Sequence, residues 1–561
     1  MKPVWIRLIS ALICFVLALS CFAGCKPNRD NDPVSSDGAP SDSAVEPTDS
    51  SEPEPTAEEP ESSEIPEDDT WEVPTEEPVA EEDDLIRMNA QIKNLTPLST
   101  RYMGSGTGVY YCYTFMNDQY GRVCTDQMAK VEMDRLQNMG IHTVRSMFKF
   151  LWARDESAPD GWNWESDDMK AVYKWLTEME KRDIDVMLNP WSFGHLTTGN
   201  ASISDTPYFN TGDFTENSKR WCDAVAELYR QLYARGHNNV KYLVLFTEPI
   251  YANEENIELQ YDQYVENAKR LHNVLSAAGL RRRITVMGPN RSDADTRLLK
   301  QLSAEADEAI DIYSQHQYLS AADLTADTYS ADALGKWGLL AQEVRSSGIT
   351  KPFWVDEWNI QDYSKTKAGY SNVGFDDPMR GVQQAVGIIT GMNLGIDNMM
   401  LWALADQQWP NQRNTGLSSG FYDGVSKHGL FNNIQITMTP KAQYYSYSLL
   451  SKYTGRGGGT TYAGVPEDEY YGIYIGCVKT SDGDWTIIAV NNNIEDARLT
   501  VDIEASLGGV KLFRHQYVAN EVQANIAAQI IPANKTFQNV TTAFTDILRG
   551  NSVAVYTTIK G

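Results

Sequence analysis

The sequence predicts an α/β fold: a (β/α)8 TIM barrel followed by a small C-terminal antiparallel β-sandwich domain. Between residue 108 and about residue 453, eight short apolar runs alternate with stretches of helical periodicity. No glycine-rich phosphate loop follows the first run, which favours a closed barrel over an open doubly wound sheet. After Gly455 the pattern changes to alternating apolar and polar residues with turn signals, which is typical of antiparallel strands.

Each apolar run is expected to form one barrel strand, at residues 109–115, 142–148, 185–190, 241–247, 284–288, 310–316, 353–357 and 398–404. Helical periodicity separates these runs at 128–139, 169–181, 218–235, 261–278, 334–346 and 379–392. A last helix at 441–452 is expected to close the barrel. The pattern therefore supplies a strand and a helix for nearly every unit of the barrel.

The remaining segments define the expected domains. Sandwich strands are predicted at 470–478, 485–490, 499–503, 509–517 and 553–559. Residues 85–107 precede the first barrel strand and are expected to add an edge strand to the sandwich. The predicted organisation is a lipoprotein signal peptide at 1–24, a disordered acidic tether at 25–84, the barrel at 85–453 and the sandwich at 454–561.

The N-terminus has the pattern of a secretory signal. Lys2 and Arg7 precede a short apolar run at 8–19, which is too short for a membrane span, and small residues lead to Cys25. The ending Ala-Gly-Cys resembles the bacterial lipobox, in which the cysteine becomes the lipidated first residue. This resemblance implies an extracellular protein anchored to the bacterial cell membrane by lipid on Cys25. The alternative is an ordinary signal peptide with an incidental cysteine.

The acidity of the chain is concentrated in the predicted tether. Residues 25–84 contain 22 acidic and two basic residues and few large apolar ones, out of a formal net charge of −28 for the whole chain. Such a segment buries too little surface to fold and repels itself. The rest of the chain is mildly acidic and has no basic stripe, which argues against nucleic-acid binding.

The cysteines of the predicted body show no metal-ligand spacing; they are Cys112, Cys124, Cys222 and Cys477. A disulfide between Cys112 and Cys124 and buried free thiols are both compatible with the sequence. No cofactor is expected.

Two glutamates end apolar runs at positions typical of barrel active sites. Glu248 lies in LFTEP (245–249) and Glu357 in FWVDEWN (353–359), each at the expected C-terminal end of a strand. Active sites of TIM barrels lie at these strand ends. Two carboxylates brought together there can carry out glycoside hydrolysis, one as acid and one as nucleophile. Other polar and aromatic residues at strand ends are Arg145, Asn189, Trp191, Asn290, His316, Tyr318 and Trp402.

This ordered set resembles the clan A glycoside hydrolases, retaining (β/α)8 enzymes with glutamates at the ends of the fourth and seventh strands. By strand count Glu248 falls on the fourth and Glu357 on the seventh. The similarity continues through TPKAQYY (439–445) and SVAVY (552–556), as in members with a β-domain such as β-xylosidases, arabinofuranosidases and glucosylceramidase-like enzymes.

The resemblance implies a role for each matching residue. Glu248 would be the general acid/base and Glu357 the nucleophile. Arg145 would keep Glu357 ionised, Tyr318 would donate a hydrogen bond to it, and Trp402 would form the floor of a sugar subsite. Thr247 departs from the pattern, because most members have asparagine before the acid/base, where it contacts the sugar 2-hydroxyl. The substrate is therefore left open by the sequence.

The other substrate-binding candidates are Trp191, His195, Asn290 and His316. Tryptophan after a strand is often plain packing, and His316 could equally be a buried core histidine with satisfied hydrogen bonds. Asp356 and Trp358 flank Glu357 and are expected to point away from the barrel axis on a regular strand. No His, Asp or Glu cluster has convincing metal spacing.

We therefore predict a retaining glycosidase that acts on a poly- or oligosaccharide. Two alternatives remain at this level: a non-catalytic glycan-binding lipoprotein on the same scaffold, and a transglycosylase with the same residues and a different acceptor. Exo or endo action depends on loops whose shape the sequence does not give.

Overall fold

The computed structural model describes residues 85–111, 115, 126–190, 207–209, 211–249, 257–292, 295–319, 336–360, 375–408, 421–422, 425–432, 439–466, 472–521 and 530–560. The signal segment with Cys25, the acidic tether, Cys112 and Cys124 lie outside these residues. None of the helices within the described ranges has the length and apolar character needed to cross a membrane.

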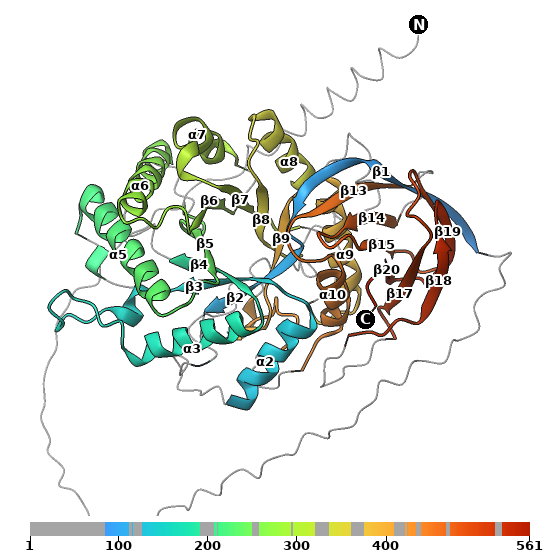
Figure 1. Cartoon of the computed structure of the whole chain (residues 1–561), viewed down its shortest axis with the longest axis horizontal. Coiled ribbons are helices and arrows are strands. Elements are labelled where there is room, and N and C mark those ends of the chain that lie inside the picture. Colours follow the sequence, from blue (N-terminus) through green and yellow to red (C-terminus); the bar gives the residue numbers. More distant parts are fainter. Residues whose placement is uncertain are drawn as a thin grey trace, which may run out of the picture. The chain divides into compact units, whose positions relative to one another are not determined.

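Eight parallel strands close into a barrel, as the sequence predicted (Figure 1). They are β2 (Ser105–Tyr111), β3 (Thr143–Phe148), β4 (Asp185–Pro190), β5 (Val240–Val244), β6 (Thr285–Arg291), β7 (Ile312–His316), β8 (Phe353–Trp358) and β9 (Asn398–Trp402). Each strand pairs in parallel with its neighbours, and β9 returns to β2. The order of strands around the barrel is therefore their order in the sequence.

One helix follows each barrel strand: α2 (Asp126–Asn138), α3 (Asp167–Lys181), α5 (Phe214–Ala234), α6 (Ile257–Ala277), α7 (Arg297–Glu305), α8 (Lys336–Ser346), α9 (Met379–Asn393) and α10 (Ala442–Tyr453). Short 3-10 turns are η2 (Phe150–Ala153), η4 (Pro207–Phe209) and η5 (Asp307–Ala309). A small sheet of β10 (Gln407–Gln408), β12 (Val425–Ser426) and β11 (Phe421–Tyr422) follows β9. Side-chain caps fix some helix starts, since the Ser166 hydroxyl accepts a hydrogen bond from the Met169 N–H.

Two barrel elements differ from the prediction. The first strand begins at Ser105, earlier than residue 109, in a glycine-rich stretch that looks like a loop in sequence. A Cβ at Gly106 would lie 2.7 Å from the Thr143 carbonyl oxygen, so glycine allows the close approach of neighbouring chain there. Helix α7 was not predicted. It is short, and its buried residues are Leu298, Leu299 and Leu302.

Apolar side chains fill the barrel interior below the strand ends. The interior cluster consists of Met187, Tyr242, Val244, Met287, Ile312, Trp354 and Met400. The opposite faces of the strands pack against the helices in a second, larger core. The barrel is thus a packed core rather than a pore, which leaves chemistry to the strand ends.

The C-terminal domain is built on a nine-stranded sheet with the order β18-β17-β20-β15-β14-β13-β1-β16-β19. Its strands are β1 (Ile86–Tyr102), β13 (Gly459–Pro466), β14 (Ile473–Lys479), β15 (Trp485–Asn491), β16 (Ala497–Ile503), β17 (Val510–Val518), β18 (Lys535–Val540), β19 (Ala543–Leu548) and β20 (Ser552–Thr557). Apolar residues of β1, β14, β15, β16, β17, β19 and β20 pack together in one core. Strands β13, β18 and β19 were not predicted.

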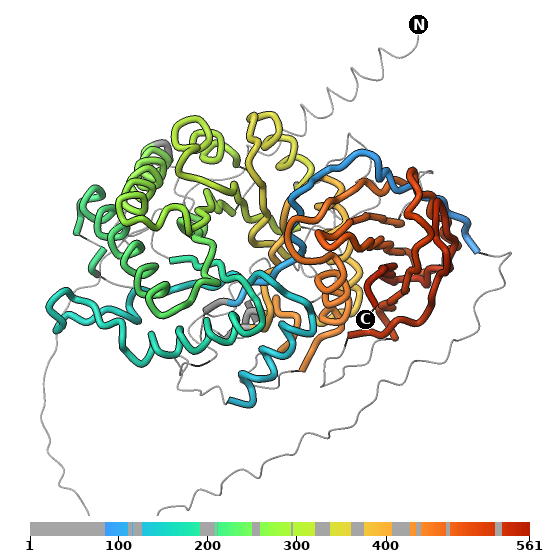
Figure 2. The backbone as a smooth tube through the Cα atoms, viewed as in Figure 1, coloured from blue at the N-terminus to red at the C-terminus, as the bar shows by residue number. Residues whose placement is uncertain are grey.

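Strand β1 lies inside this sheet and not at its edge, contrary to the expectation for residues 85–107. It pairs antiparallel with β13 and parallel with β16, so one ladder of the sheet is parallel. In Figure 1 the blue β1 lies among orange and red strands. Figure 2 shows the tube passing from this blue segment towards the barrel, and β2 begins three residues after β1 ends.

The sheet also contains a charged cluster around a buried carboxylate. Asp546 on β19 accepts hydrogen bonds from Arg514 Nη1 at 2.8 Å, Lys535 Nζ at 2.7 Å and Tyr556 Oη at 2.9 Å. We call these four residues the Asp546 cluster. Cys222 and Cys477 are buried free thiols.

Candidate active site

The predicted strand-end residues occupy the expected strands of the barrel. Arg145 lies on β3, the second barrel strand, and Glu248 follows β5, the fourth. His316 ends β7, Glu357 lies near the end of β8, and Trp402 ends β9. Because all these ends lie at one mouth of a parallel barrel, the side chains converge there.

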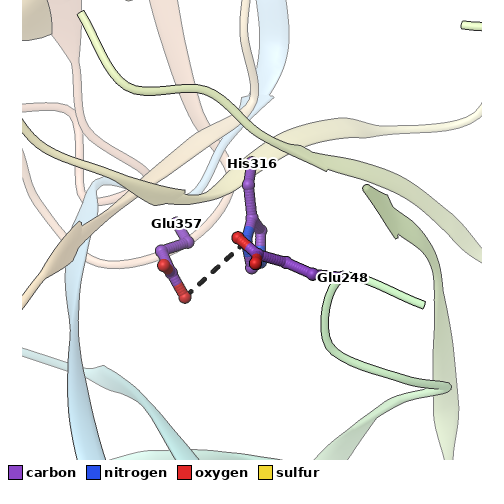
Figure 3. Close-up of side chains that lie close together, drawn as sticks. All are labelled: Glu248, His316 and Glu357. Atoms are coloured by element: carbon purple, nitrogen blue, oxygen red, sulfur yellow. Dashed lines mark hydrogen bonds and ion pairs between the residues drawn. The ribbon is translucent and has the colours of Figure 1, made fainter. Parts of the chain in front are cut away.

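Glu248, His316 and Glu357 point towards one another (Figure 3). One oxygen of each glutamate and one His316 ring nitrogen lie within 4.8 Å of each other. His316 Nδ1 is 3.0 Å from Glu248 Oε1 and 3.7 Å from Glu357 Oε2. Retaining glycosidases hold their two carboxyl groups about 5–5.5 Å apart, whereas inverting enzymes separate them by about 6.5–9.5 Å. The close spacing matches the retaining arrangement.

Glu357 is surrounded by groups that stabilise its negative charge. Arg145 Nη1 forms an ion pair with its Oε2, and Tyr318 Oη donates to its Oε1 at 2.8 Å. Burial acts to raise the pKa of Glu357, but the charges of His316 and Arg145 and the two hydrogen bonds hold it below its usual range. Burial and then the Glu357 charge raise the pKa of Tyr318 well above its usual range, so the phenol keeps its proton. Both contacts expected from the sequence are present.

Glu248 has a more open environment. Its side chain is 25% exposed, against 9% for Glu357, and its contact in this cluster is with His316. The backbone of Glu248 has a φ of 42°, a left-handed conformation that is unfavourable for glutamate. Its N–H donates to the Asn290 carbonyl at 3.0 Å. The two carboxylates therefore differ in exposure and in the number of cations beside them.

His316 bridges the two glutamates electrostatically. Arg145 Nη2 lies 3.3 Å from His316 Nε2, and His316 Nδ1 on the other side of the ring lies 3.0 Å from Glu248 Oε1. Burial acts to lower the pKa of His316, yet the Glu357 charge and the hydrogen bond to Glu248 raise it overall. His316 is fully buried and belongs to the site, which rules out a place in the apolar core away from it.

Thr247 occupies the position where most clan A members have asparagine. Its hydroxyl accepts hydrogen bonds from other side chains of the protein. Its Oγ1 accepts from Arg145 Nη2 at 3.1 Å and from Asn189 Nδ2. With both lone pairs used, the Thr247 hydroxyl has only its proton left to donate. Asn189 on β4 was noted at a strand end but was not expected to contact Thr247.

Trp402 lies beside the site and is 9% exposed. The Arg145 guanidinium is 5.8 Å from the centre of its ring. Asn359 Nδ2 donates to the Trp402 carbonyl and, at 3.1 Å, to the His428 carbonyl, and the His428 ring packs edge-on against Tyr318. Sequence reasoning missed both Asn359 and His428. Asn359 could have been found from its place two residues after Glu357, but His428 lies outside any strand and gives no such signal.

Two residues do not lie where the sequence placed them. Asn290, expected to contact substrate, is fully buried and donates through Nδ2 to Asp356 Oδ2. Asp356, expected to point away from the barrel axis, meets Asn290 across β7, and side chains of β6 and β8 can meet only inside the barrel. Burial raises the pKa of Asp356. Trp358 does point outward, towards Trp337 on α8, with ring centres 5.0 Å apart.

The structure does not place every candidate. Trp191 and His195 lie outside the described residues. Among the residues that the structure describes, Glu248, His316 and Glu357 are also the one group whose ligand atoms are close enough for a metal ion. Arg145 already pairs with Glu357, and its fixed positive charge opposes a second cation there.

The family model described as Cellulase (glycosyl hydrolase family 5) matches residues 99–405. A sequence search of curated proteins found no match.

Solved structures share the fold at low identity. A glycoside hydrolase family 30 subfamily 8 xylanase from Clostridium acetobutylicum is 15% identical, with a TM-score of 0.54, covering 84% of this chain and 99% of that one. A conserved exported protein from Bacteroides fragilis is 12% identical, with a TM-score of 0.58 and coverage of 83% and 99%. A family 51 arabinofuranosidase from Xanthomonas axonopodis pv. citri is 12% identical, with a TM-score of 0.53 and coverage of 84% and 99%.

The family match covers more than half of the chain and includes Arg145, Glu248, His316, Glu357 and Trp402. The chain therefore belongs to the cellulase family, glycosyl hydrolase family 5, within clan A, and is a retaining glycoside hydrolase.

Proposed function

We propose that Glu357 is the nucleophile and Glu248 the general acid/base of a double-displacement reaction. The observation that carries this assignment is the unequal surroundings of two carboxylates within 4.8 Å. Arg145, His316 and Tyr318 stabilise the charge of Glu357, as a nucleophile requires. Glu248 is more exposed, which suits a group that exchanges protons with leaving group and water.

In the first step, Glu357 forms a bond to the anomeric carbon while the glycosidic C–O bond breaks. The Glu248 proton moves to the departing oxygen. In the second step, Glu248 takes a proton from water, whose oxygen attacks the anomeric carbon and releases Glu357 as a carboxylate. Arg145 and Tyr318 hold Glu357 in place in both steps, and the Trp402 ring offers an apolar face to the sugar.

We propose a β-linked glucan or xylan, or oligosaccharides from one, as the substrate. The name of the matching family, cellulase, supports this class. Structural neighbours include a xylanase and an endo-β1,6-glucanase, and the resemblance to β-xylosidases agrees. The hydroxyl of Thr247 replaces the usual asparagine amide, so the substrate group beside it should accept a hydrogen bond.

We further propose that the chain is an exported lipoprotein. The charged start, the short apolar run and Ala23-Gly24-Cys25 support lipidation of Cys25, and the acidic segment at 25–84 would hold the barrel away from the membrane surface. Cys25→Ala should move the protein from the membrane fraction to the medium. An unchanged distribution would contradict the anchor.

The assignment of the two glutamates is tested with variants on a panel of aryl β-glucosides, aryl β-xylosides, β-glucans and xylan. Glu248→Gln should lower kcat by about 10²- to 10⁴-fold on polysaccharide and regain activity with azide on activated aryl glycosides. With Glu357→Gln, azide should not restore activity through formation of a β-glycosyl azide. Glu343→Gln is the control, an exposed carboxylate on α8 paired with Lys300.

Three outcomes are decisive. Loss in both site variants with azide rescue only at 248 supports the assignment. Rescue only at 357 reverses the two roles. A wild-type protein that binds the polysaccharides and hydrolyses none of the panel contradicts the double-displacement proposal, and products longer than the substrate would identify transglycosylation.

A further inference from the structure

Two β-bulges lie beside the catalytic strand ends. Along β6 and β7, Pro289 pairs with Ser314 but Arg291 pairs with Gln315, so Asn290 is an extra residue. A bulge inserts one residue into one strand of a pair and redirects the side chains that follow.

The second bulge lies in β8, on the other side of β7. Val355 pairs with Gln315 and Glu357 pairs with His316, so Asp356 is the extra residue. On a regular strand Glu357 would face the helices, as Val355 does in the outer core. The inserted Asp356 lets Glu357 reach Arg145 across the barrel mouth.

The two inserted residues contact each other. Asn290 Nδ2 donates to Asp356 Oδ2, and both side chains are buried. Their strands flank β7, so this contact crosses the barrel interior and joins strands that share no backbone hydrogen bonds.

The same contact reaches the acid/base through the main chain. The Asn290 carbonyl accepts the Glu248 N–H at 3.0 Å. Asn290 and Glu248 have φ values of 61° and 42°, a conformation that asparagine tolerates and glutamate does not favour. Such backbone persists only where its surroundings fix it.

We propose that the Asn290–Asp356 pair is a positioning device that sets Glu248 relative to Glu357. Asp356 redirects the nucleophile strand, and its hydrogen bond holds Asn290, whose carbonyl fixes the backbone of the acid/base. Neither residue touches the substrate. The inference rests on the proposed roles of Glu248 and Glu357.

A displaced acid has a kinetic signature that general destabilisation lacks. A good leaving group such as 2,4-dinitrophenolate departs without a proton, whereas a sugar or alkyl leaving group needs one. Displacing Glu248 therefore slows the first step, which kcat/KM reports, more for a glycoside with a poor leaving group than for one with a good leaving group.

The test measures kcat/KM, which reports the first step, on both kinds of glycoside of the sugar that the wild type hydrolyses. Asp356→Leu should lower kcat/KM for the alkyl glycoside or disaccharide by about 100-fold, and should lower it much less for the dinitrophenyl glycoside. Asp356→Asn keeps an oxygen acceptor for Asn290 and should restore both rates to within about threefold of the wild type.

The matched control is Asp397→Leu. Asp397 is also buried and accepts a hydrogen bond from the Phe353 N–H at 2.9 Å. Phe353 is the first residue of β8, so this contact lies at the end of the strand opposite to Glu357. Asp397→Leu should lower the melting temperature while leaving the ratio of the two rates unchanged. A second variant, Asn290→Asp, keeps a residue type suited to φ of 61° but sets two carboxyls against each other, and should reproduce the leaving-group ratio of Asp356→Leu.

The inference is overturned if Asp356→Leu or Asn290→Asp slows both substrates equally, or if Asp356→Asn is as impaired as the leucine variant. If Asp356→Leu does not fold, the ratio in Asn290→Asp alone decides. A wild type without activity on either glycoside would instead contradict the proposed function, so the two failures are distinguishable.

Discussion

The barrel mouth and the C-terminal sheet each contain a buried carboxylate with similar partners. Glu357 contacts Arg145, Tyr318 and the His316 ring, and Asp546 contacts Arg514, Tyr556 and Lys535. Their side chains are 9% and 1% exposed. An arginine, a tyrosine hydroxyl and a second nitrogen donor therefore surround both, so an ion pair with a tyrosine does not by itself mark an active site.

The difference lies in what stands opposite the carboxylate. Glu357 faces a second, partly exposed carboxylate, that of Glu248. Within the described part of the chain, only Glu248, His316 and Glu357 form a close group of three His, Cys, Asp or Glu side chains. The donors around Asp546 come from β17, β18 and β20 of one sheet and tie those strands to β19. At the barrel mouth the second carboxylate stays accessible to solvent. In the sheet the partners of Asp546 only compensate the charge of a buried carboxylate.

The largest effect should separate the two carboxylates by activity. Glu357→Gln removes the proposed nucleophile and should lower kcat by about 10⁴-fold or more, with little loss of melting temperature. Steady-state kinetics and thermal unfolding of the same preparation test both statements. If the variant retained a tenth of the wild-type kcat, Glu357 would not be the nucleophile.

The converse substitution should act on stability. Asp546→Asn leaves Arg514 and Lys535 without their buried counter-charge and should cost about 3 kcal/mol of unfolding free energy. The kcat per folded molecule should equal that of the wild type. Chemical denaturation and active-site titration check this, and a fall in kcat at full folding would contradict the separation between the two regions.

Substitution by lysine should have different effects at Arg145 and at Arg514. Arg145 uses Nη1 for Glu357 and Nη2 for Thr247, a geometry that a single ammonium cannot reproduce, so Arg145→Lys should lower kcat about 10- to 100-fold. Arg514→Lys should instead lower stability by about 1–2 kcal/mol and leave kcat unchanged. Equal kinetic losses in both variants would show that the comparison fails.

The smallest expected effect is on the pH profile. As the proposed nucleophile, Glu357 must be ionised to attack, so activity should fall as the pH drops through its pKa in the folded enzyme. Because the charges of His316 and Arg145 hold this pKa low against burial, the acidic limb of kcat/KM should lie below the usual glutamate range. The same ionisation stabilises the fold above the unfolded-state pKa, and this contribution is lost as the pH falls through the folded value.

His316→Asn removes the largest of the effects that lower the pKa of Glu357. The acidic limb of kcat/KM should therefore move to higher pH in this variant, by an amount read directly from the profile. A limb that stays in place would mean that His316 does not act on Glu357.

Much of the site could be predicted because the order of strands in the sequence gives their order around a closed barrel. Glu248 and Glu357 follow apolar runs, and Arg145, His316 and Tyr318 lie at the ends of others, so their convergence follows from the closed order of strands. The bulges at Asn290 and Asp356 could not be predicted, because side-chain alternation assumes a regular strand and an inserted residue reverses the face.

The C-terminal sheet shows the same limit. Strand β1 was recognised as sheet-forming, but its place between β13 and β16 depends on pairing with residues several hundred positions away. The role of Thr247 was unclear for a related reason, since its two donors come from Arg145 on β3 and Asn189 on β4. Long-range partners of this kind leave no periodic signal in the sequence.

The most direct test of the central claim is covalent trapping. Incubation with 2,4-dinitrophenyl 2-deoxy-2-fluoro-β-glucoside and its xyloside counterpart, followed by peptide mass spectrometry, should find one sugar attached to Glu357. A sugar attached to Glu248 or to another residue would contradict the assignment of the nucleophile. Hydrolysis of the matching unfluorinated glycoside with inversion at the anomeric carbon would contradict the double displacement itself.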